Sequence, residues 1–426
     1  MDRIYAVIGL GSVGLELALA LSKHAEVIGF DLSQERISEL SQHHDHDGII
    51  SEAALKKSPI KFTAKLHDIK PANFYFVTVP TPVYYYTLPD LENLVQATYS
   101  IAKMIKKGDF IVYESTVYPG TTEEISIKVI EDVSKLTCGV DFEVGYSSEH
   151  YNPGDNSHNL ANSTKVVGAT NQRALKEIVG VYETICQSVY PASSIKVAEA
   201  SKMLENTQKD VNIALMNEFS KIMHAMDIDV DEVIDAASKR WQFTRYKPGL
   251  VGGHRVAVDP LYLAFKAKRH GIDPEIILTA RKVNDGMSQY IIQEMVKLLM
   301  KRGANLHSIK IGIFGVTYKN DIPDVRNSMV LKLTKELNDY QINYVVHDPI
   351  VEPDLLSERY QINPVSYEDL HDLDVAILAV GHRFYVEKGL SDMIKKVKTD
   401  GIFMDIPSLF KKKEALNFAN YTFWWL

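Results

Sequence analysis

The sequence predicts an α/β fold in which two Rossmann-like parallel-sheet domains are joined by a long central helical segment. Short β-branched runs alternate with helical apolar patterns toward both ends of the chain, which is typical of parallel sheets covered by helices on both faces. Between these two regions, residues 198–226 carry apolar side chains at helical spacing. The length of 426 residues also agrees with two or three domains. We expect domain boundaries that give residues 1–195, 196–304 and 305–426.

The elements of the first domain follow in order from the N-terminus. Residues 4–8 are expected to form a strand, residues 15–21 a helix and residues 25–30 a second strand. Further strands, with helical segments between several of them, are expected at residues 74–79, 110–113, 143–146 and 165–167. This order predicts a parallel sheet covered on both faces.

The central segment is expected to be mostly helical. Residues 198–226 predict one long connecting helix packed against a partner, and residues 229–238 predict a shorter helix. A glycine-rich loop at residues 248–253 interrupts the helical pattern, which resumes at residues 274–301. Strands with helices between them are then expected again, at residues 310–314, 344–347, 375–379 and 402–404.

Composition narrows the class of protein. Lys and Arg number 47 and Asp and Glu 55, so the formal charge of −8 argues against a general partner in nucleic acid or anionic membrane. It still allows a local basic pocket for a phosphorylated small molecule. Cys138 and Cys186 are too few for a disulfide framework or a multi-cysteine metal site, and a reducing cytoplasm is expected. No metal site is predicted. No secretory signal order begins the chain, and no apolar stretch approaches the roughly 20 residues of a membrane span.

A glycine-rich turn follows the first expected strand. Gly9, Gly11 and Gly14 form G-x-G-x-x-G at the opening of the first helix, which is typical of a turn that brings backbone and a helix N-terminus close to a pyrophosphate. Asp31 ends the second strand, where a carboxylate can bind an adenosine ribose and would repel a 2′-phosphate. The pattern therefore predicts NAD as the cofactor. Arg36 could instead tolerate a 2′-phosphate, although we expect it to be a solvated helix residue.

Two further loops follow expected strands. Thr78, Val79, Pro80 and Thr81 follow one strand, and Ser115 and Thr116 follow another. Small hydroxyl residues and turn formers at the carboxyl ends of parallel strands lie where ligands bind in this architecture. Taken alone, each of these loops is also ordinary loop chemistry.

Other motifs occur in one order along nearly the whole chain. They are residues 78–82, Ser115-Thr116, Ser147-Ser148-Glu149 with Asn152-Pro153-Gly154, Lys202 with Glu205-Asn206-Thr207, Gly252-Gly253-His254 with Val258-Asp259-Pro260, and Lys319 with residues 324–328. In this order they resemble the UDP-glucose/GDP-mannose dehydrogenase family, the nucleotide-sugar 6-dehydrogenases. Residues 205–218 and 250–260 look most like the branch that acts on UDP-N-acetylglucosamine and UDP-N-acetylmannosamine in capsule and O-antigen synthesis.

The resemblance implies oxidation of a sugar C6 alcohol to a carboxylate with two NAD⁺ consumed per sugar. Lys202 and Asn206 are four residues apart on the long helix and would stabilise charge on the C6 oxygen. By the same resemblance, Glu149 would activate water for a final hydrolysis, Asp259 would join the lysine in a proton relay, and Thr116 would hold a water near the nicotinamide. The structural alternatives are a Lys202–Asp259 ion pair, an Asn206 that caps a bend and a Glu149 at the surface.

A second group of residues is expected at the substrate. Gly252 and Gly253 lack a Cβ, so their N–H groups could close on the sugar. Lys319 and Arg326 resemble family residues around the uridine diphosphate, and Lys247 is expected to add a cation for the phosphates. The alternative for Lys319 and Arg326 is a solvated face.

The sequence departs from the family where its nucleophilic cysteine is expected. Arg255 stands at that position, directly after Gly252-Gly253-His254. In the family a thiolate attacks the C6 aldehyde and leaves a thioester for water to cleave. A guanidinium is protonated at any workable pH and cannot make this attack. Cys138 and Cys186 lie outside every matched motif, so neither is expected to replace it. Further departures are Ser148 for proline, His150 for arginine, Val256 and Ala257 in the nucleophile loop, and Pro407 for a late lysine.

The leading hypothesis is thus a NAD-dependent UDP-N-acetylhexosamine 6-dehydrogenase, expected as a cytoplasmic homodimer, whose full oxidation to the uronate is severely impaired by Arg255. A first, two-electron step needs no thiol. A second hypothesis is a non-catalytic nucleotide-sugar binding protein. A third is a two-electron dehydrogenase of the 6-phosphogluconate type, against which the C-terminal domain with Lys319 argues.

Overall fold

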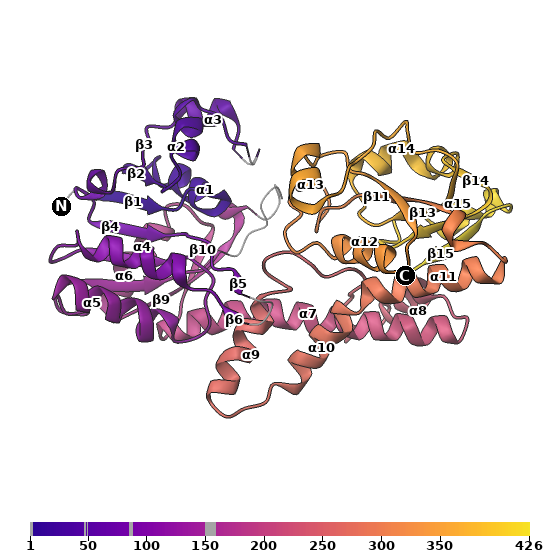
Figure 1. Cartoon of the computed structure of the whole chain (residues 1–426). Coiled ribbons are helices and arrows are strands. Elements are labelled where there is room, and N and C mark those ends of the chain that lie inside the picture. Colours follow the sequence, from indigo (N-terminus) through magenta and orange to yellow (C-terminus); the bar gives the residue numbers. More distant parts are fainter. Residues whose placement is uncertain (1–2, 47, 49, 85–87, 150–158) are drawn as a thin grey trace. The chain divides into compact units, whose positions relative to one another are not determined.

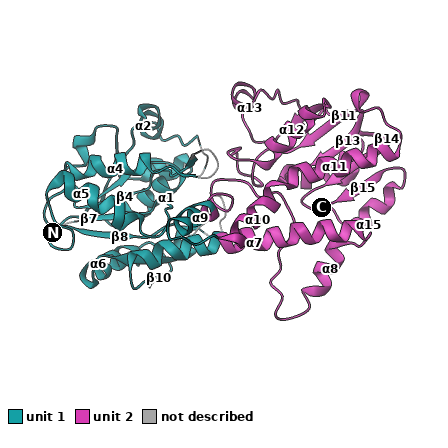
Figure 2. Ribbon diagram, turned by 60° about the horizontal axis from the view of Figure 1, so that its bottom comes forward, with its two compact units in different colours: residues 1–206, 261–273 teal, residues 207–260, 274–426 magenta. Residues whose placement is uncertain are grey.

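The computed structural model describes residues 3–46, 48, 50–84, 88–149 and 159–426. The chain divides into two compact units, one formed by residues 1–206 with 261–273 and the other by residues 207–260 with 274–426 (Figure 2). Each unit is built around its own β-sheet (Figure 1). The predicted α/β class, with two parallel sheets and a long helix between them in the sequence, is confirmed.

The first unit contains an eight-stranded sheet in the order β10-β9-β8-β7-β4-β1-β2-β3. Its strands, with the small hairpin β5–β6, are β1 (Ile4–Ile8), β2 (Glu26–Phe30), β3 (Lys61–Thr63), β4 (Phe74–Val77), β5 (Val83–Tyr84), β6 (Leu88–Pro89), β7 (Phe110–Tyr113), β8 (Glu143–Tyr146), β9 (Thr164–Ala169) and β10 (Ser188–Pro191). The helices are α1 (Ser12–Leu21), α2 (Gln34–Ser41), α3 (Glu52–Lys57), α4 (Glu92–Ala102), α5 (Ile127–Ser134) and α6 (Gln172–Tyr182), with the short turns η1 (Leu66–Ile69), η2 (Thr122–Ser126) and η3 (Leu160–Asn162). The sheet is parallel except where β8 pairs with β9.

Alternation along the strands fills two cores, one on each face of this sheet. Tyr5 and Val7 of β1 join the core that α1 and α6 cover, whereas Ala6 and Ile8 join the core that α4 and α5 cover. Successive side chains of a strand point to opposite faces, so a strand buried on both faces reads as a continuous apolar run. The strand order reverses beside β1, between β2 and β4, and in such folds ligands bind outside the carboxyl ends of the strands at this point.

The second unit contains a five-stranded, fully parallel sheet in the order β12-β11-β13-β14-β15. Its strands are β11 (Lys310–Phe314), β12 (Asn343–His347), β13 (Leu373–Leu378), β14 (Val397–Asp405) and β15 (Thr422–Trp425). Its helices are α8 (Val230–Ala237), α10 (Glu275–Asp285), α11 (Met287–Lys301), α12 (Met329–Asp339), α13 (Pro353–Tyr360), α14 (Arg383–Ile394) and α15 (Lys412–Ala415), with η4 (Leu306–Ser308) and η5 (Leu416–Phe418). The apolar sides of α11 and α12 pack on one face and α14 packs on the other.

Two helices contribute residues to both units. The long helix α7 (Ile195–Ala225) begins in the first unit and ends in the second, and α9 (Asp259–Arg269) crosses the boundary between Pro260 and Leu261. The helix α9 was not predicted from the sequence, because the helical pattern was expected to resume only at residue 274. Pro260 is compatible with the first turn of a helix, and the Arg255 carbonyl accepts the N–H groups of Val258 and Asp259 in the turn that leads into it. No helix in the described residues is long and apolar enough to cross a membrane.

Candidate functional site

The glycine turn after β1 is closely packed against the loop after β4. Gly9 adopts a φ of +93°, and a Cβ on Gly14 would lie 1.9 Å from the Gly9 carbonyl oxygen and 2.4 Å from the Thr78 Oγ1. The Thr78 hydroxyl donates to that same Gly9 carbonyl at 2.6 Å. These contacts require glycine at positions 9 and 14 for conformation and for close approach, respectively.

Gly11 differs from its two neighbours because its missing Cβ faces open space. It is the residue before the first turn of α1, and, apart from its neighbours in the chain, no atom of the described residues lies within 4 Å of the position where its Cβ would be. As a glycine it has no side chain with which to cap the helix. An exposed glycine at the N-terminus of a helix lets the backbone approach a pyrophosphate closely, so this turn fits a dinucleotide.

Asp31 and Arg36 hold the glycine turn through Leu10. One carboxylate oxygen of Asp31 accepts the Leu10 N–H at 2.8 Å and the other accepts the Ser33 N–H at 2.9 Å. The Arg36 Nε donates to the Leu10 carbonyl at 2.9 Å. Asp31 is thus held at the carboxyl end of β2, next to the turn, as a ribose ligand would need to be.

The expectation that Arg36 is solvated was wrong. Its side chain is only 7% exposed, and its guanidinium pairs with Asp45 at 2.8 Å and with Glu39 at 3.2 Å. Glu39 lies on α2 itself, three residues after Arg36, and Asp45 lies nine residues after it, beyond the end of that helix. Because two carboxylates already bind the guanidinium, the structure favours NAD over NADP at this position.

The loops after β4 and β7 are tied to each other by their hydroxyl groups. Thr81 donates to the Thr116 carbonyl at 2.6 Å, and Ser115 donates to the Val79 carbonyl at 2.7 Å. The Val79 side chain also lies 3.2 Å from the Cβ position of Gly9. The structure therefore brings these predicted residues together with the glycine turn, while Pro80 lies exposed at the same edge.

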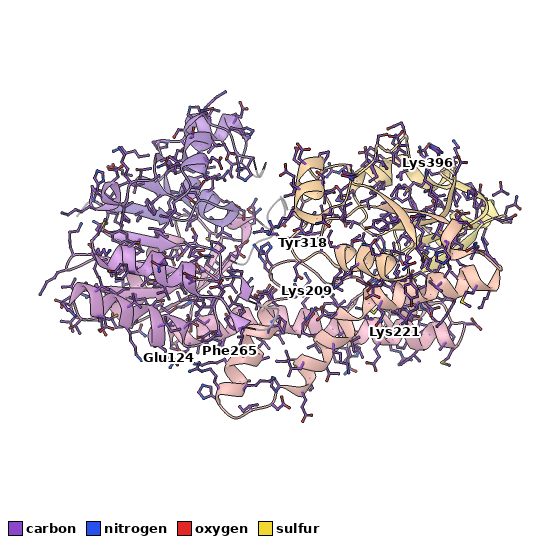
Figure 3. The ribbon with its side chains drawn as sticks, in the orientation of Figure 1. Glu124, Lys209, Lys221, Phe265, Tyr318 and Lys396 are labelled. Carbon is purple, nitrogen blue, oxygen red and sulfur yellow. The ribbon has the colours of Figure 1, made fainter. Side chains whose placement is uncertain are left out.

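Tyr262 was not expected and supports the same edge. Its hydroxyl, near the start of α9, donates to the carbonyls of Thr81 and Pro82 at 2.7 and 3.0 Å. Further along α9, Lys266 pairs with Glu124 at 2.7 Å, beside the ring contact of Phe265 with Tyr118; Glu124 and Phe265 are labelled in Figure 3. No motif in the sequence pointed to Tyr262, because its helix was not predicted.

Three of the expected catalytic residues in the first unit are buried. Glu149 is 6% exposed, so the alternative of a surface carboxylate was wrong. Lys202 and Asn206 are buried one turn apart on α7. The Nζ of Lys202 lies 3.9 Å from a carboxylate oxygen of Glu205. Residues 150–158, including His150 and Asn152-Pro153-Gly154, lie outside the described residues. Asp259 is buried at the start of α9, in the second unit as the chain is divided.

Glu199 is a second residue that sequence reasoning missed. It lies three residues before Lys202 on α7, is fully buried, and accepts the N–H groups of Gly120 and Thr122. Burial raises the pKa of its carboxyl to about 7, against the lowering effect of these N–H groups. Glu199 therefore fastens the helix that carries Lys202 to the turn that follows Thr116.

The second unit has a cavity of about 240 Å³ at the carboxyl ends of its strands. Thr317 and Tyr318 after β11, Val380 after β13, and Ile406 and Pro407 after β14 line it. Its remaining wall includes Pro248, Gly249, Leu250 and Gly252 from the glycine-rich loop. The strand order reverses between β11 and β13, so this cavity also lies where ligands bind in open parallel sheets.

The glycine-rich loop is packed against the loop after β11. A Cβ on Gly252 would lie 2.5 Å from the Asn327 carbonyl, and a Cβ on Gly253 would lie 2.6 Å from the ring of Tyr318, labelled in Figure 3. The Gly253 N–H donates to the Asn327 carbonyl at 3.2 Å. Close packing accounts for both glycines, and their contact with a sugar stays a prediction.

The expected phosphate-binding cations are exposed near this cavity's loops. Lys319 follows Tyr318, and Arg326 makes several hydrogen bonds to Asp324, one of them at 2.6 Å. Lys247 precedes the glycine-rich loop and lies 3.9 Å from Asp231. Their exposure agrees both with solvated cations and with cations that meet a diphosphate.

Arg255 is half-buried in the turn before α9, and neither cysteine is suited to replace a thiolate there. Burial raises the pKa of Cys138 to about 12 and that of Cys186 to about 12. Both groups therefore stay protonated near neutral pH, and a protonated thiol is a poor nucleophile.

Three family models match the chain in succession. The NAD binding domain of the UDP-glucose/GDP-mannose dehydrogenase family matches residues 3–186, its central domain residues 196–286, and its UDP binding domain residues 312–412. Together they cover most of the chain in the order that the motifs indicated.

Individual relatives extend over nearly the full length. The chain is 42% identical to a UDP-N-acetyl-D-glucosamine 6-dehydrogenase of Pseudomonas aeruginosa, with 97% of this chain and 99% of that protein covered. It is 41% identical to a protein of the same description from Salmonella typhi, with 96% and 97% covered. A solved UDP-D-ManNAc dehydrogenase from Pyrococcus horikoshii superposes with a TM-score of 0.90 at 27% identity, with 99% of both chains covered.

Proposed function

The chain belongs to the UDP-glucose/GDP-mannose dehydrogenase family of NAD-dependent UDP-sugar dehydrogenases, and on this premise we propose that it oxidises C6 of a UDP-N-acetylhexosamine toward the uronate, with full oxidation severely impaired by Arg255. Relatives at 41–42% identity that are described as UDP-N-acetyl-D-glucosamine 6-dehydrogenases support this choice of sugar class. The observation that carries the proposal is that each sheet has a site for a ligand at the carboxyl ends of its strands. The first sheet has the glycine turn there, and the second has the 240 Å³ cavity.

NAD is proposed to bind at the first edge. Gly9, Gly11 and Gly14 would admit the pyrophosphate, Asp31 would bind the adenosine ribose, and the loop of Val79, Pro80 and Thr81 with Ser115 would border the nicotinamide half. When bound, NAD accepts the hydride from C6 of the sugar.

The nucleotide end of the substrate is proposed to bind in the second unit. The cavity lined by Tyr318, Val380 and Pro407 would hold the uridine, and Lys319, Arg326 and Lys247 would neutralise the diphosphate. Gly252 and Gly253 let the loop approach Tyr318 and Asn327 closely, which shapes the wall next to that position.

Four residues are proposed to act at C6. Lys202 and Asn206 present their polar groups from one side of α7, because a spacing of four residues places them on the same face. They would stabilise negative charge on the C6 oxygen as its proton leaves, with Asp259 accepting that proton through a water. Thr116 would hold a water beside the nicotinamide, and Glu149 would activate water for hydrolysis of an acyl intermediate.

Arg255 limits this chemistry to what needs no thiol. Loss of a covalent nucleophile lowers turnover by several orders of magnitude in enzymes that depend on one. With Cys138 and Cys186 protonated and outside the matched motifs, no thiolate of this chain is placed to form the thioester. We therefore propose that the first, two-electron oxidation persists and that the second is largely lost.

Arg255 also favours a second candidate function, that of a nucleotide-sugar binding protein without turnover. It would retain NAD and UDP-sugar affinity and form no NADH. This candidate and the dehydrogenase differ in one measurement, the formation of NADH by the unaltered chain.

We also propose a homodimer formed through α7. Leu204, Leu215 and Ile222 on this helix are 65%, 60% and 48% exposed, and their spacings of 11 and 7 residues place them on one side of it. A second copy that presents the same apolar stripe would cover it. Leu215→Glu should convert the dimer to a monomer in light scattering, and an unaltered chain of monomer mass would contradict the proposal.

The chain is also proposed to be organised in three domains and to act in the cytoplasm. We propose an NAD-binding domain at residues 1–195, a helical segment with the active-site loop at 196–304 and a UDP-binding domain at 305–426, which the order of the family models supports. A role in precursor synthesis for a surface polysaccharide and a cytoplasmic setting are likewise proposed, the latter supported by two free thiols.

The experiment that tests the proposed function measures NADH formation with UDP-N-acetylglucosamine, UDP-N-acetylmannosamine and UDP-glucose. The proposal expects turnover with an N-acetylated sugar and less with UDP-glucose, and loss of turnover in Lys202→Met. Turnover with UDP-glucose alone would refute the sugar class. Binding of both ligands with no NADH, even in Arg255→Cys, would support the binding protein instead.

A further inference from the structure

A buried ion pair joins two strand ends of the first unit. Lys165 lies near the start of β9 and Glu114 directly follows β7, and their charged groups are 2.7 Å apart with side chains that are 0% and 1% exposed. The proposed reaction assigns neither residue a role. Burying two charges costs several kcal/mol each in desolvation, so a well-packed apolar pair would stabilise the core at least as well.

The ammonium group of Lys165 has three N–H donors, and each has an acceptor. Besides Glu114, it donates to the Ser148 carbonyl at 3.0 Å and to the Ser147 carbonyl at 3.2 Å. Ser148 immediately precedes Glu149 in the chain. The cation therefore fixes the backbone that carries the proposed hydrolytic carboxylate.

The other side of the pair is fixed just as completely. Tyr182 donates its hydroxyl to the second oxygen of Glu114, and its ring centroid lies 5.0 Å from the Lys165 nitrogen. Glu114 immediately precedes Ser115, whose hydroxyl holds the Val79 carbonyl. One buried cation thus links the segment that ends at Glu149 to the segment that begins the Ser115-Thr116 loop.

We propose that Lys165 and Glu114 are positioning residues that hold Glu149 at a fixed place relative to the Ser115-Thr116 loop; this inference rests on the proposed role of Glu149. In the hydrolytic step, which needs the thiol that Arg255→Cys supplies, Glu149 takes a proton from water as the water oxygen bonds to the thioester carbon. The carbon–sulfur bond then breaks, and the thiolate leaves and regains a proton. A misplacement of about 1 Å in such a group can lower the rate about 100-fold.

The test uses the full chain with Arg255→Cys, in which a thioester can form. Glu114→Gln with Lys165→Met removes the cation without leaving a single buried charge, which would otherwise be strongly destabilising. The control is Glu143→Gln with Arg173→Met, which removes an ion pair at the opposite end of β8. Glu114→Gln alone is the milder variant, because it keeps Lys165 and an acceptor oxygen but removes the counter-charge of the cation.

Two measurements decide the outcome. In hydrogen–deuterium exchange, the backbone amides of residues 144–149 should exchange about tenfold faster in the double variant than in the parent. Their exchange rates in the control pair should equal those of the parent. When the double variant is given substrate, mass spectrometry should show a covalent sugar adduct on residue 255. Its steady-state turnover should fall about tenfold or more, while the amplitude of its first NADH burst stays within about twofold of the parent. Glu114→Gln alone should change both measurements in the same direction but by less than the double variant.

The arms separate this inference from the proposed function. Absence of an adduct in Glu149→Gln would overturn the role of Glu149 itself. An adduct in Glu149→Gln but none in the double variant, or unchanged exchange of residues 144–149, would overturn the positioning role. If the double variant does not fold, Glu114→Gln still decides: exchange of residues 144–149 and turnover equal to those of the parent would contradict the positioning role.

Discussion

Gly14 lies so close to Gly9 that a Cβ on Gly14 would sit 1.9 Å from the Gly9 carbonyl oxygen. The first turn of α1 can therefore approach β1 only because position 14 has no side chain. This contact sets the position of Gly11, whose own missing Cβ faces open space.

The contrast between these glycines gives the first prediction. Gly14→Ala should lower the melting temperature and abolish measurable NAD binding, since the turn must open to admit the methyl group. Gly11→Ala should fold with a loss of about 1 kcal/mol or less but bind NAD more weakly, because its methyl group points where the pyrophosphate would approach. Calorimetric titration with NAD and thermal unfolding of both variants check this. NAD binding by Gly14→Ala at parental affinity would contradict the packing argument.

Cofactor choice should depend on Asp31 rather than on Arg36. Asp31→Ser should weaken NAD about tenfold and narrow the preference over NADP, because it removes a ribose acceptor and a repulsive charge. It should not create strong NADP use, since Asp45 and Glu39 already bind the Arg36 guanidinium. The ratio of kcat/KM for the two cofactors is the measurement. A strong preference of Asp31→Ser for NADP would show that Arg36 is available after all.

The two cysteines should be unreactive toward alkylating reagents in the folded chain. Because burial raises the pKa of both thiols to about 12, iodoacetamide at pH 7.5 should modify neither in the folded chain and both after denaturation. Cys138→Ser and Cys186→Ser should leave NADH formation unchanged. Intact-mass analysis checks the first expectation and initial rates the second. Rapid alkylation of Cys186 with loss of activity would reveal a substitute nucleophile.

Glu199 predicts a fall in stability between about pH 5 and 7. The unfolded chain releases this proton near the ordinary carboxyl pKa, whereas the folded chain holds it up to about 7. The folded state therefore binds more protons in this interval, and its free energy of unfolding decreases as the pH rises. Glu199→Gln, which has no proton to release, should flatten that part of the profile in urea unfolding. The exposed Glu35→Gln should not; equal slopes for Glu199→Gln and the parent would argue against a raised pKa.

The sequence predicted the elements that depend on local pattern. The bounds expected for β1, β7, β8 and β11 agree with the structure, because apolar runs flanked by turns define them. The glycine turn and Asp31 were likewise predicted to lie together, since a strand–turn–helix–strand unit brings the ends of β1 and β2 side by side.

What the sequence could not predict depends on partners that meet only after folding. Arg36 was expected in solvent, yet it is buried, and the nearer of its two carboxylate partners, Asp45, lies beyond the end of α2. Lys165 began an expected strand, and its partner Glu114 is 51 residues away. A charged residue in an apolar strand is a signal that a partner exists, but not of which one. The helix α9 was hidden because a glycine-rich loop with irregular apolar spacing precedes it.

The central claim concerns Arg255, and the amount of NADH formed per molecule of UDP-N-acetylhexosamine consumed tests it most directly. The unaltered chain should yield at most about one NADH per sugar with no uronate, because no thiolate stands at position 255 to carry the second oxidation. Arg255→Cys should yield two NADH and the uronate. Two NADH per sugar at a comparable rate from the unaltered chain would contradict the account.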